Sequence, residues 1–138
     1  METARSIYLG ELRIESTHVR SGKILITDAP PDNKGKGEAF SPTDLLATSL
    51  GTCMMTIMGI SAQTHGFNVE GTTIGITKIM AENPRRVAEV VVEFTFPKII
   101  YSEKEKAFIK HAAETCPVNL SLHPDLKRTI LLNFFEGA

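Results

Sequence analysis

The chain contains two cysteines, Cys53 and Cys116, and both stand where a thiol could do chemistry. Cys53 lies near the middle of the most apolar segment of the sequence. Cys116 is followed directly by Pro117, at the end of a segment with the pattern of an amphipathic helix. Two thiols far apart in sequence support reversible dithiol–disulfide chemistry if the fold brings them together. Otherwise both are ordinary core residues, because free cysteine packs as a small hydrophobe.

A reactive Cys53 needs help from its surroundings, because burial alone favours the protonated and inert form of a thiol. Ser49, Thr52 and Thr56 are close in sequence and could supply hydrogen bonds. Gly51 permits a local break in the helix, which would leave Cys53 near a new helix N-terminus, where a thiolate is favoured. No Lys or Arg is close in sequence. A cation must therefore come from elsewhere in the fold.

Other uses of the two thiols receive less support from the sequence. There is no Cys-x-x-Cys pair, which excludes a thioredoxin-like motif. The four histidines show no metal-ligand spacing with either cysteine, so we expect no metal site; they are His18, His65, His111 and His123. A Cys–His hydrolase dyad stays open, with nothing in the sequence to favour it.

Length and charge set the general class of the protein. The 138 residues predict one domain, residues 1–138, that can bury a core without disulfides. The net charge of −1 and the lack of a basic stripe argue against a nucleic-acid partner. The first six residues show no pattern of a signal peptide. We therefore expect a cytoplasmic protein, in which structural disulfides are rare.

The first half of the chain predicts strands, a loop and one long helix. Residues 6–28 have strand character, and residues 29–37 are rich in turn formers and predict a mobile surface loop. Ser41 can cap a helix, and Asp44 can complete a capping box with it. The helix is expected to run to His65, where Gly66 can end it.

The predicted helix carries no charged residue from Leu45 to Thr64. Its length would suit a membrane span, but hydroxyl and amide side chains make it too polar, so we expect no membrane contact. These side chains are Thr48, Ser49, Thr52, Thr56, Ser61 and Gln63. A helix without a charged face is otherwise buried on all sides. One sheet cannot surround it, so a second copy of the chain is the natural partner.

The second half predicts two strands, a helix and a last strand. The strands cover 72–79 and 87–96, with Asn83-Pro84 in the turn between them. A helix begins at the capping box of Ser102 and continues to Cys116, and a last strand covers 129–135. Pro117 either ends that helix or starts a short turn. This order predicts an α+β fold with antiparallel sheets around the central helix.

Alternating side chains define the inner face of the second of these strands. Ala88, Val90, Val92, Phe94 and Phe96 fall on one face, and polar side chains fall on the other.

Residues 41–53, Ser-Pro-Thr-Asp-Leu-Leu-Ala-Thr-Ser-Leu-Gly-Thr-Cys, resemble a segment of the OsmC/Ohr superfamily. In that segment a proline, an acid, an apolar run and small residues lead to a peroxide-reactive cysteine. Pro42 lies eleven positions before Cys53, as the pattern requires. Cys116-Pro117-Val118, followed by Ser121-Leu122, is similar to the second cysteine segment of the same family. The order of elements matches across nearly the whole chain.

The resemblance implies an intertwined homodimer in which two long central helices pack between sheets. It also implies a thiol peroxidase with an antioxidant role in oxidative stress and no cofactor. In the peroxidase branches the first cysteine attacks a hydroperoxide and becomes a sulfenic acid, and the second condenses with it to a disulfide. A dithiol reductant, commonly a lipoylated protein, then reopens the disulfide. Cys53 and Cys116 map onto these two roles.

One position departs from the best-studied branches. There the residue after the proline is often Glu, which orients an Arg over the thiolate, whereas here it is Thr43. Asp44 is one helical step of about 100° further round and is expected only to cap the helix. Glu38 is the proposed substitute. Arg20 is the predicted cation, with Arg13 as the runner-up, because the family's Arg comes from the N-terminal sheet; the alternative is that Arg20 is a solvated turn residue.

Two other functions stay open. An OsmC-like dimer without peroxidase activity could hold a small apolar ligand, or Cys53 could take part in sulfur transfer. In the peroxidase interpretation, some of Met54, Met55, Ile57 and Met58 line an apolar pocket suited to an organic peroxide. By default these side chains fill the core.

Overall fold

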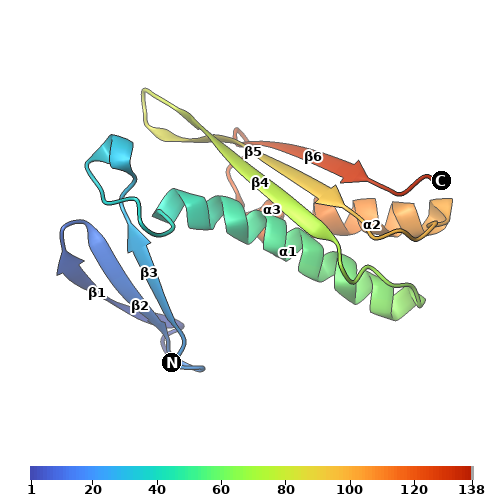
Figure 1. The fold of residues 1–138 in the computed structure, drawn as a ribbon, viewed down its shortest axis with the longest axis horizontal. Coiled ribbons are helices and arrows are strands. Elements are labelled where there is room, and N and C mark those ends of the chain that lie inside the picture. The colour runs from blue at the N-terminus through green and yellow to red at the C-terminus, as the bar shows by residue number, and fades with distance from the viewer. Residues whose placement is uncertain (138) are drawn as a thin grey trace. The chain divides into compact units, whose positions relative to one another are not determined.

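The structure, a computed structural model, describes residues 1–137 (Figure 1). The chain forms two compact units, Met1–Leu46 and Ala47–Ala138. The elements of the first unit are β1 (Ala4–Gly10), β2 (Arg13–His18), β3 (Ile24–Asp28) and the 3-10 helix η1 (Pro31–Asn33). The helix α1 (Pro42–His65) begins in this unit and continues into the second. There it is followed by β4 (Thr73–Ala81), β5 (Arg86–Thr95), α2 (Glu103–Thr115), α3 (Pro117–Ser121) and β6 (Lys127–Asn133).

The first unit is a three-stranded antiparallel sheet in the order β1-β2-β3. A turn at Glu11 and Leu12 interrupts the expected strand region 6–28 soon after it begins. Glu11 and Leu12 both adopt positive φ, 55° and 63°, and make the turn between β1 and β2. Leu12 therefore lies in a turn rather than in a strand. The loop predicted over residues 29–37 contains one turn of 3-10 helix at η1.

Local signals set both ends of α1, as the sequence predicts. The backbone N–H of Ser41 donates to Asp44 Oδ2 at 2.9 Å, and the backbone N–H of Asp44 donates to Ser41 Oγ at 3.0 Å. This is a capping box with Asp in place of Glu. Gly66 has φ +75°, the left-handed conformation that ends a helix. The capping role expected for Asp44 is confirmed.

The predicted break at Gly51 is wrong, because α1 is continuous from Pro42 to His65. Gly51 instead allows α1 and β4 to pack closely. A Cβ at this position would lie 2.7 Å from Ile76 Cδ1 and 2.9 Å from Ile76 Cγ1. Contacts this short are overlaps, so the absence of a side chain at Gly51 sets how near the helix approaches the strand.

We expect Gly51→Val to destabilise the protein by about 1–3 kcal/mol, because the added methyl groups overpack against Ile76. Gly59 is the matched control, since it lies in the same helix and an added Cβ meets nothing within 4 Å. Gly59→Val should be neutral or slightly stabilising. Urea unfolding of the two variants measures the difference, and equal midpoints would contradict the close-approach role of Gly51.

Within one chain α1 buries a single stripe of side chains. Leu50, Met54 and Met58 are fully buried, whereas Thr52 and Ile60 are exposed. Length and composition alone would allow α1 to cross a membrane, with a mean hydropathy of 1.5 over its most apolar window. The core helix of a globular protein has the same composition. The single chain therefore covers one side of α1 and leaves apolar groups on the other.

The second unit contains a three-stranded sheet in the order β4-β5-β6, with α1 and α2 alongside it (Figure 1). β4 and β5 are antiparallel, but β5 and β6 are parallel. The sheet is therefore mixed, and the expectation of wholly antiparallel sheets is wrong for β6. The reason is the connection: α2 and α3 lie between β5 and β6 and carry the chain back before β6 begins.

The inner face of β5 follows the predicted alternation except at one residue. Val90, Val92 and Phe94 are fully buried, in one core cluster with residues of α1 and α2. The pairing with β4 slips between Ile79 and Met80, so Ala88 has no directly opposite residue. This bulge reverses the alternation, and Val87 packs against the core in place of Ala88.

Candidate functional site

The second unit brings the thiols of Cys53 and Cys116 together. Cys53 is half-buried on α1, and Cys116 is completely buried at the junction of α2 and α3. Both are free cysteines, and the two side chains interact through hydrogen bonding and charge. The arrangement holds two reduced thiols side by side, one reachable from solvent and the other enclosed.

The environment of Cys116 keeps its thiol protonated. Burial is the largest cause and raises the pKa of Cys116 above its ordinary value of 9.0, and Cys53 raises it further. Backbone N–H groups of Asn119 and Val118 act in the opposite direction without reversing the shift. A neutral, enclosed thiol is a poor first nucleophile. It suits a second step, in which it attacks a sulfur that has already been oxidised.

Local sequence explains why Cys116 sits where it does. Ser102 and Glu105 form the predicted capping box at the start of α2, which is thereby confirmed. The buried stripe of α2, Ile109, Ala112 and Ala113, continues to Cys116. Pro117 then stops α2 and occupies the first position of α3, for which Cys116 is the N-cap residue.

The hydroxyl groups nearest Cys53 in sequence are used within the helix. Thr52 Oγ1 donates to the carbonyl oxygens of Thr48 at 3.0 Å and Ser49 at 3.2 Å. Thr56 Oγ1 donates to the Thr52 carbonyl at 2.8 Å. The protons of Thr52 and Thr56 are therefore not directed at the Cys53 sulfur, in contrast to the expectation from the sequence.

The first unit contains a network centred on Arg13. Arg13 Nε donates to Asp28 Oδ1 at 2.7 Å and Nη2 donates to Asp28 Oδ2 at 2.8 Å. The same Nη2 donates to Glu38 Oε1 at 2.9 Å, and the Glu38 N–H donates to Asp28 Oδ2 at 3.1 Å. The structure thus joins the predicted Glu38 to Arg13, the runner-up cation. Arg20 is exposed in the turn between β2 and β3, so the structure does not join it to Glu38.

Asp28 makes the stability of this unit depend on pH. Its hydrogen bonds to Arg13 are the largest cause lowering the pKa of the carboxyl below its ordinary value of 3.8, although burial opposes the shift. The unfolded chain therefore binds a proton at higher pH than the folded chain does. Stability from this carboxylate is present above the ordinary value and is lost as the pH falls through the lowered one.

We expect Asp28→Asn to be less stable than the wild type at pH 7, and to lose less stability on acidification. Denaturant unfolding between about pH 5 and pH 2 measures both effects. Glu2→Gln is the control, because Glu2 pairs with Arg5 in an exposed ion pair that contributes little. Parallel acid profiles for wild type and Asp28→Asn would contradict this role for Asp28.

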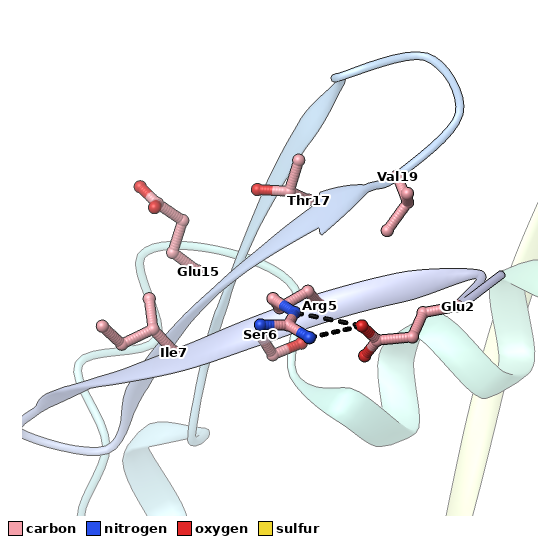
Figure 2. Close-up of a pocket in the computed structure, with 7 residues that line it drawn as sticks. All are labelled: Glu2, Arg5, Ser6, Ile7, Glu15, Thr17 and Val19. Carbon is pink, nitrogen blue, oxygen red and sulfur yellow. Dashed lines mark hydrogen bonds and ion pairs between the residues drawn. The ribbon is translucent and has the colours of Figure 1, made fainter.

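The first unit also has a shallow hollow of about 670 Å³ on the β1–β2 hairpin (Figure 2). The Arg5 guanidinium donates to the Glu2 carboxylate within it. None of the predicted site residues lines this hollow; its lining is Glu2, Arg5, Ser6, Ile7, Glu15, Thr17 and Val19. Within residues 1–137, no group of three or more His, Cys, Asp or Glu side chains is placed to hold a metal ion.

Comparison with known proteins identifies the family. The sequence profile described as "OsmC-like protein" matches residues 35–130, which include both cysteines. The chain belongs to the OsmC-like family. This OsmC-like protein is 47% identical to a provisionally named osmotic stress induced and detoxification response protein from Psychrobacter arcticus. That crystal structure superimposes with a TM-score of 0.92 and the match covers 96% of each chain.

More distant solved structures share the fold. An organic hydroperoxide resistance protein OsmC from Legionella pneumophila is 15% identical, with 94% of each chain covered and a TM-score of 0.75. An organic hydroperoxide resistance protein from Elizabethkingia anophelis is 13% identical, with 97% of each chain covered and a TM-score of 0.66. No functionally curated protein matches the chain. The predicted α+β OsmC-like fold is confirmed.

Sequence reasoning missed three residues that organise these sites. Asn119 donates its backbone N–H to Cys116 Sγ at 3.4 Å, and Arg128 binds the backbone of the same segment. The position of Asn119, three residues after an N-cap followed by proline, is the available signal. Asp28, the partner of Arg13, has no comparable signal, because the pair forms only when β2 and β3 align.

Proposed function

We propose that this OsmC-like protein is a thiol-dependent peroxidase that reduces organic or small hydroperoxides. The observation that carries the proposal is the meeting of Cys53 and Cys116 as free thiols with unequal access to solvent. Cys53 is the accessible one and takes the role of first nucleophile. Cys116, buried and protonated, takes the role of the resolving thiol.

The chemistry balances with a hydroperoxide and a dithiol as the only reactants. The Cys53 thiolate attacks the distal peroxide oxygen, the O–O bond breaks, and the alkoxide leaves and takes a proton to become the alcohol. Cys53 is then a sulfenic acid. Cys116 Sγ attacks that sulfur, the S–O bond breaks, and the hydroxide leaves as water with the Cys116 proton. A dithiol reductant, for which a lipoylated protein is the proposed source, reduces the disulfide by thiol–disulfide exchange.

Names of proteins with the same fold support this reaction class. The Legionella and Elizabethkingia proteins are both named for organic hydroperoxide resistance, and the Legionella protein is also described as a redox protein. Their low identity to this chain supports the fold alone, so the assignment of function rests on the paired thiols. A stress-related role is in keeping with the name of the Psychrobacter protein.

We further propose that an arginine stabilises the Cys53 thiolate. Arg20 and Arg13 are the two candidates from the N-terminal sheet. Arg13 is supported by its fixed guanidinium, which Asp28 and Glu38 hold in one orientation. The rate of Cys53 alkylation as a function of pH distinguishes them, because removal of the relevant cation shifts the profile to higher pH. Arg13→Gln and Arg20→Gln are the two variants to compare.

The proposal includes a homodimer in the cytoplasm. Support comes from large apolar side chains that a single chain leaves exposed, among them Ile7, Tyr8, Ile24, Ile60 and Leu120. A second copy would cover apolar surface of this kind. Sedimentation equilibrium measures the assembly, and a monomer at micromolar concentration would contradict it. A reducing cytoplasm also supplies the dithiols on which turnover depends.

The direct test is the mass of the reduced protein after treatment with one equivalent of cumene hydroperoxide or hydrogen peroxide. We expect a loss of two hydrogens, with Cys53 linked to Cys116 in the peptide map. Faster reaction with the organic peroxide would support an apolar substrate pocket. Thiols that survive this treatment would contradict the peroxidase proposal. A tightly held small apolar ligand would then favour the ligand-binding alternative.

A further inference from the structure

Arg128, the second residue of β6, binds the segment that follows Cys116. Its Nη1 donates to the carbonyl oxygens of Leu126 at 2.7 Å and His123 at 3.2 Å. Its Nη2 donates to the carbonyl oxygen of Asn119 at 3.0 Å. One guanidinium therefore ties α3 and the loop after it to the start of β6, using three backbone acceptors.

Asn119 connects this guanidinium to the sulfur of Cys116. Its backbone N–H donates to Cys116 Sγ at 3.4 Å, and its side-chain Nδ2 donates to the carbonyl oxygen of Glu114 at 2.8 Å. Asn119 thus accepts from Arg128, contacts the thiol, and holds the last turn of α2. A short chain of bonds leads from Arg128 to the thiol without direct contact between the two.

The other contacts of α3 are the packing of Val118 against the core and a bond from Ser121 Oγ to the Pro117 carbonyl oxygen within the helix. The helix has five residues, and none of them is fully buried. A helix this short has no stability of its own in water. The Nε of Arg128 and the Oδ1 of Asn119 are buried, and across residues 1–137 neither has a hydrogen-bond partner. A change at Arg128 therefore removes the guanidinium bonds to the carbonyl oxygens of Asn119, His123 and Leu126, whereas a change of the Asn119 side chain removes only its Nδ2 bond to Glu114.

We propose that Arg128 is a positioning residue for Cys116: acting through Asn119 and α3, it keeps the Cys116 thiol within reach of Cys53. Its role in turnover rests on the proposed peroxidase function. The effect of Arg128 on the rate at which the two sulfurs join does not depend on peroxidase activity. The Cys116 sulfur must approach the Cys53 sulfur in line with the bond from that sulfur to its leaving group. Such reactions become much slower when the attacking atom is not held in place.

The chemistry of arginine makes this role specific. Its planar fork reaches three carbonyl oxygens in different directions, which a lysine ammonium on a flexible stem does not reproduce. Arg128→Lys keeps the charge and removes the fork, so it separates positioning from electrostatics. Arg128→Gln removes both. Asn119→Ala keeps the backbone N–H on the sulfur and removes only the Nδ2 bond to Glu114.

Arg86 provides a matched control in the same sheet. Its Nη1 donates to the carbonyl oxygens of Glu82 at 3.2 Å and Pro84 at 2.8 Å, in a turn that carries no cysteine. Arg86→Gln removes arginine–carbonyl bonds of the same kind without touching the segment after Cys116. Near-ultraviolet circular dichroism identifies which variants keep the native fold.

The experiment measures disulfide closure in two ways. In the first, diazenedicarboxamide oxidises the reduced protein. One thiol adds to the N=N bond of the reagent, and the second thiol then attacks the first sulfur and displaces the reagent as a hydrazine. The hydrazine carries away the two electrons and two protons that the thiols lose. In the second, a hydroperoxide forms the Cys53 sulfenic acid, and mass spectrometry follows its conversion to disulfide or, with a second peroxide molecule, to sulfinic acid. The first way needs no peroxidase activity.

We expect closure to be slower by about tenfold or more in Arg128→Gln and Arg128→Lys, to fall less in Asn119→Ala, and to change within about twofold in Arg86→Gln. With peroxide, the Arg128 variants should form sulfenic acid at the wild-type rate and accumulate more sulfinic acid. Wild-type closure with diazenedicarboxamide in folded Arg128→Lys and Asn119→Ala would overturn the positioning role. If diazenedicarboxamide closes the disulfide slowly in these variants and the wild type does not react with peroxide, the positioning role is supported and the peroxidase function is rejected.

Discussion

Replacement of Cys53 by serine is expected to reduce dithiol-supported peroxide turnover at least about a thousandfold, to the level of the buffer reaction. A serine hydroxyl stays protonated at neutral pH and does not attack the O–O bond. The fold should be retained, because Cys53 is half-buried and the substitution is nearly isosteric. Peroxide consumption with a lipoyl-type dithiol measures the effect, and the wild-type protein at equal concentration is the reference.

Thr52→Ser is the matched control for this experiment. Thr52 precedes Cys53 on α1 and bonds to the helix backbone through its hydroxyl group, which serine also provides. The control should turn over at the wild-type rate. Equal turnover in Cys53→Ser and the wild type would eliminate Cys53 as the nucleophile. The ligand-binding alternative would be supported if the wild type shows no peroxide turnover and holds an apolar ligand that Cys53→Ser also retains.

Elements of this fold with local signals were predictable from the sequence. The ends of α1 follow from Ser41 and Asp44 at one end and Gly66 at the other, because capping bonds join residues only three positions apart. The start of α2 follows from Ser102 and Glu105 for the same reason. Such bonds depend on the neighbouring sequence, so reading along the chain is sufficient to find them.

Features that depend on contacts across the fold were not predictable in this way. The parallel pairing of β6 depends on where α2 and α3 return the chain. The bulge at Ala88 appears only when β5 is aligned with β4. Gly51 has the sequence signature of a weak point in a helix, whereas its actual role is defined by Ile76, which lies on a different element. In each case the deciding partner is distant in sequence.

The candidate site also contains residues with local sequence signals and residues whose partners are distant in sequence. Cys53 and Cys116 were found because their flanking residues resemble family segments, and the fold then brings their thiols together. The sequence does not indicate the network of hydrogen bonds in either unit. Arg13 meets Asp28 through strand register, and Arg128 meets the backbone of Asn119, which any residue type would present. Because every residue has a backbone carbonyl, no particular residue type in the sequence indicates the partner of such an arginine.

Replacement of Cys116 by serine is expected to separate the first chemical step from the rest. Cys53 should still react with the first equivalent of hydroperoxide, because Cys116 takes no part in breaking the O–O bond. The sulfenic acid then has no neighbouring thiol with which to condense. A second peroxide molecule oxidises it to sulfinic acid, which a dithiol does not reduce. We expect a burst of about one equivalent, followed by loss of activity within a few turnovers.

Intact mass against added equivalents of peroxide measures this outcome. The wild type should lose two hydrogens and remain at that mass, whereas Cys116→Ser should gain two oxygens at Cys53. Serine preserves a small acceptor for the Asn119 N–H, so α3 keeps the contact that Cys116 makes at 3.4 Å. Sustained turnover of Cys116→Ser without sulfinic acid would mean that the dithiol reduces the sulfenic acid directly. In that case the enclosed thiol would be a core residue, and closure of the disulfide would be no part of the catalytic cycle.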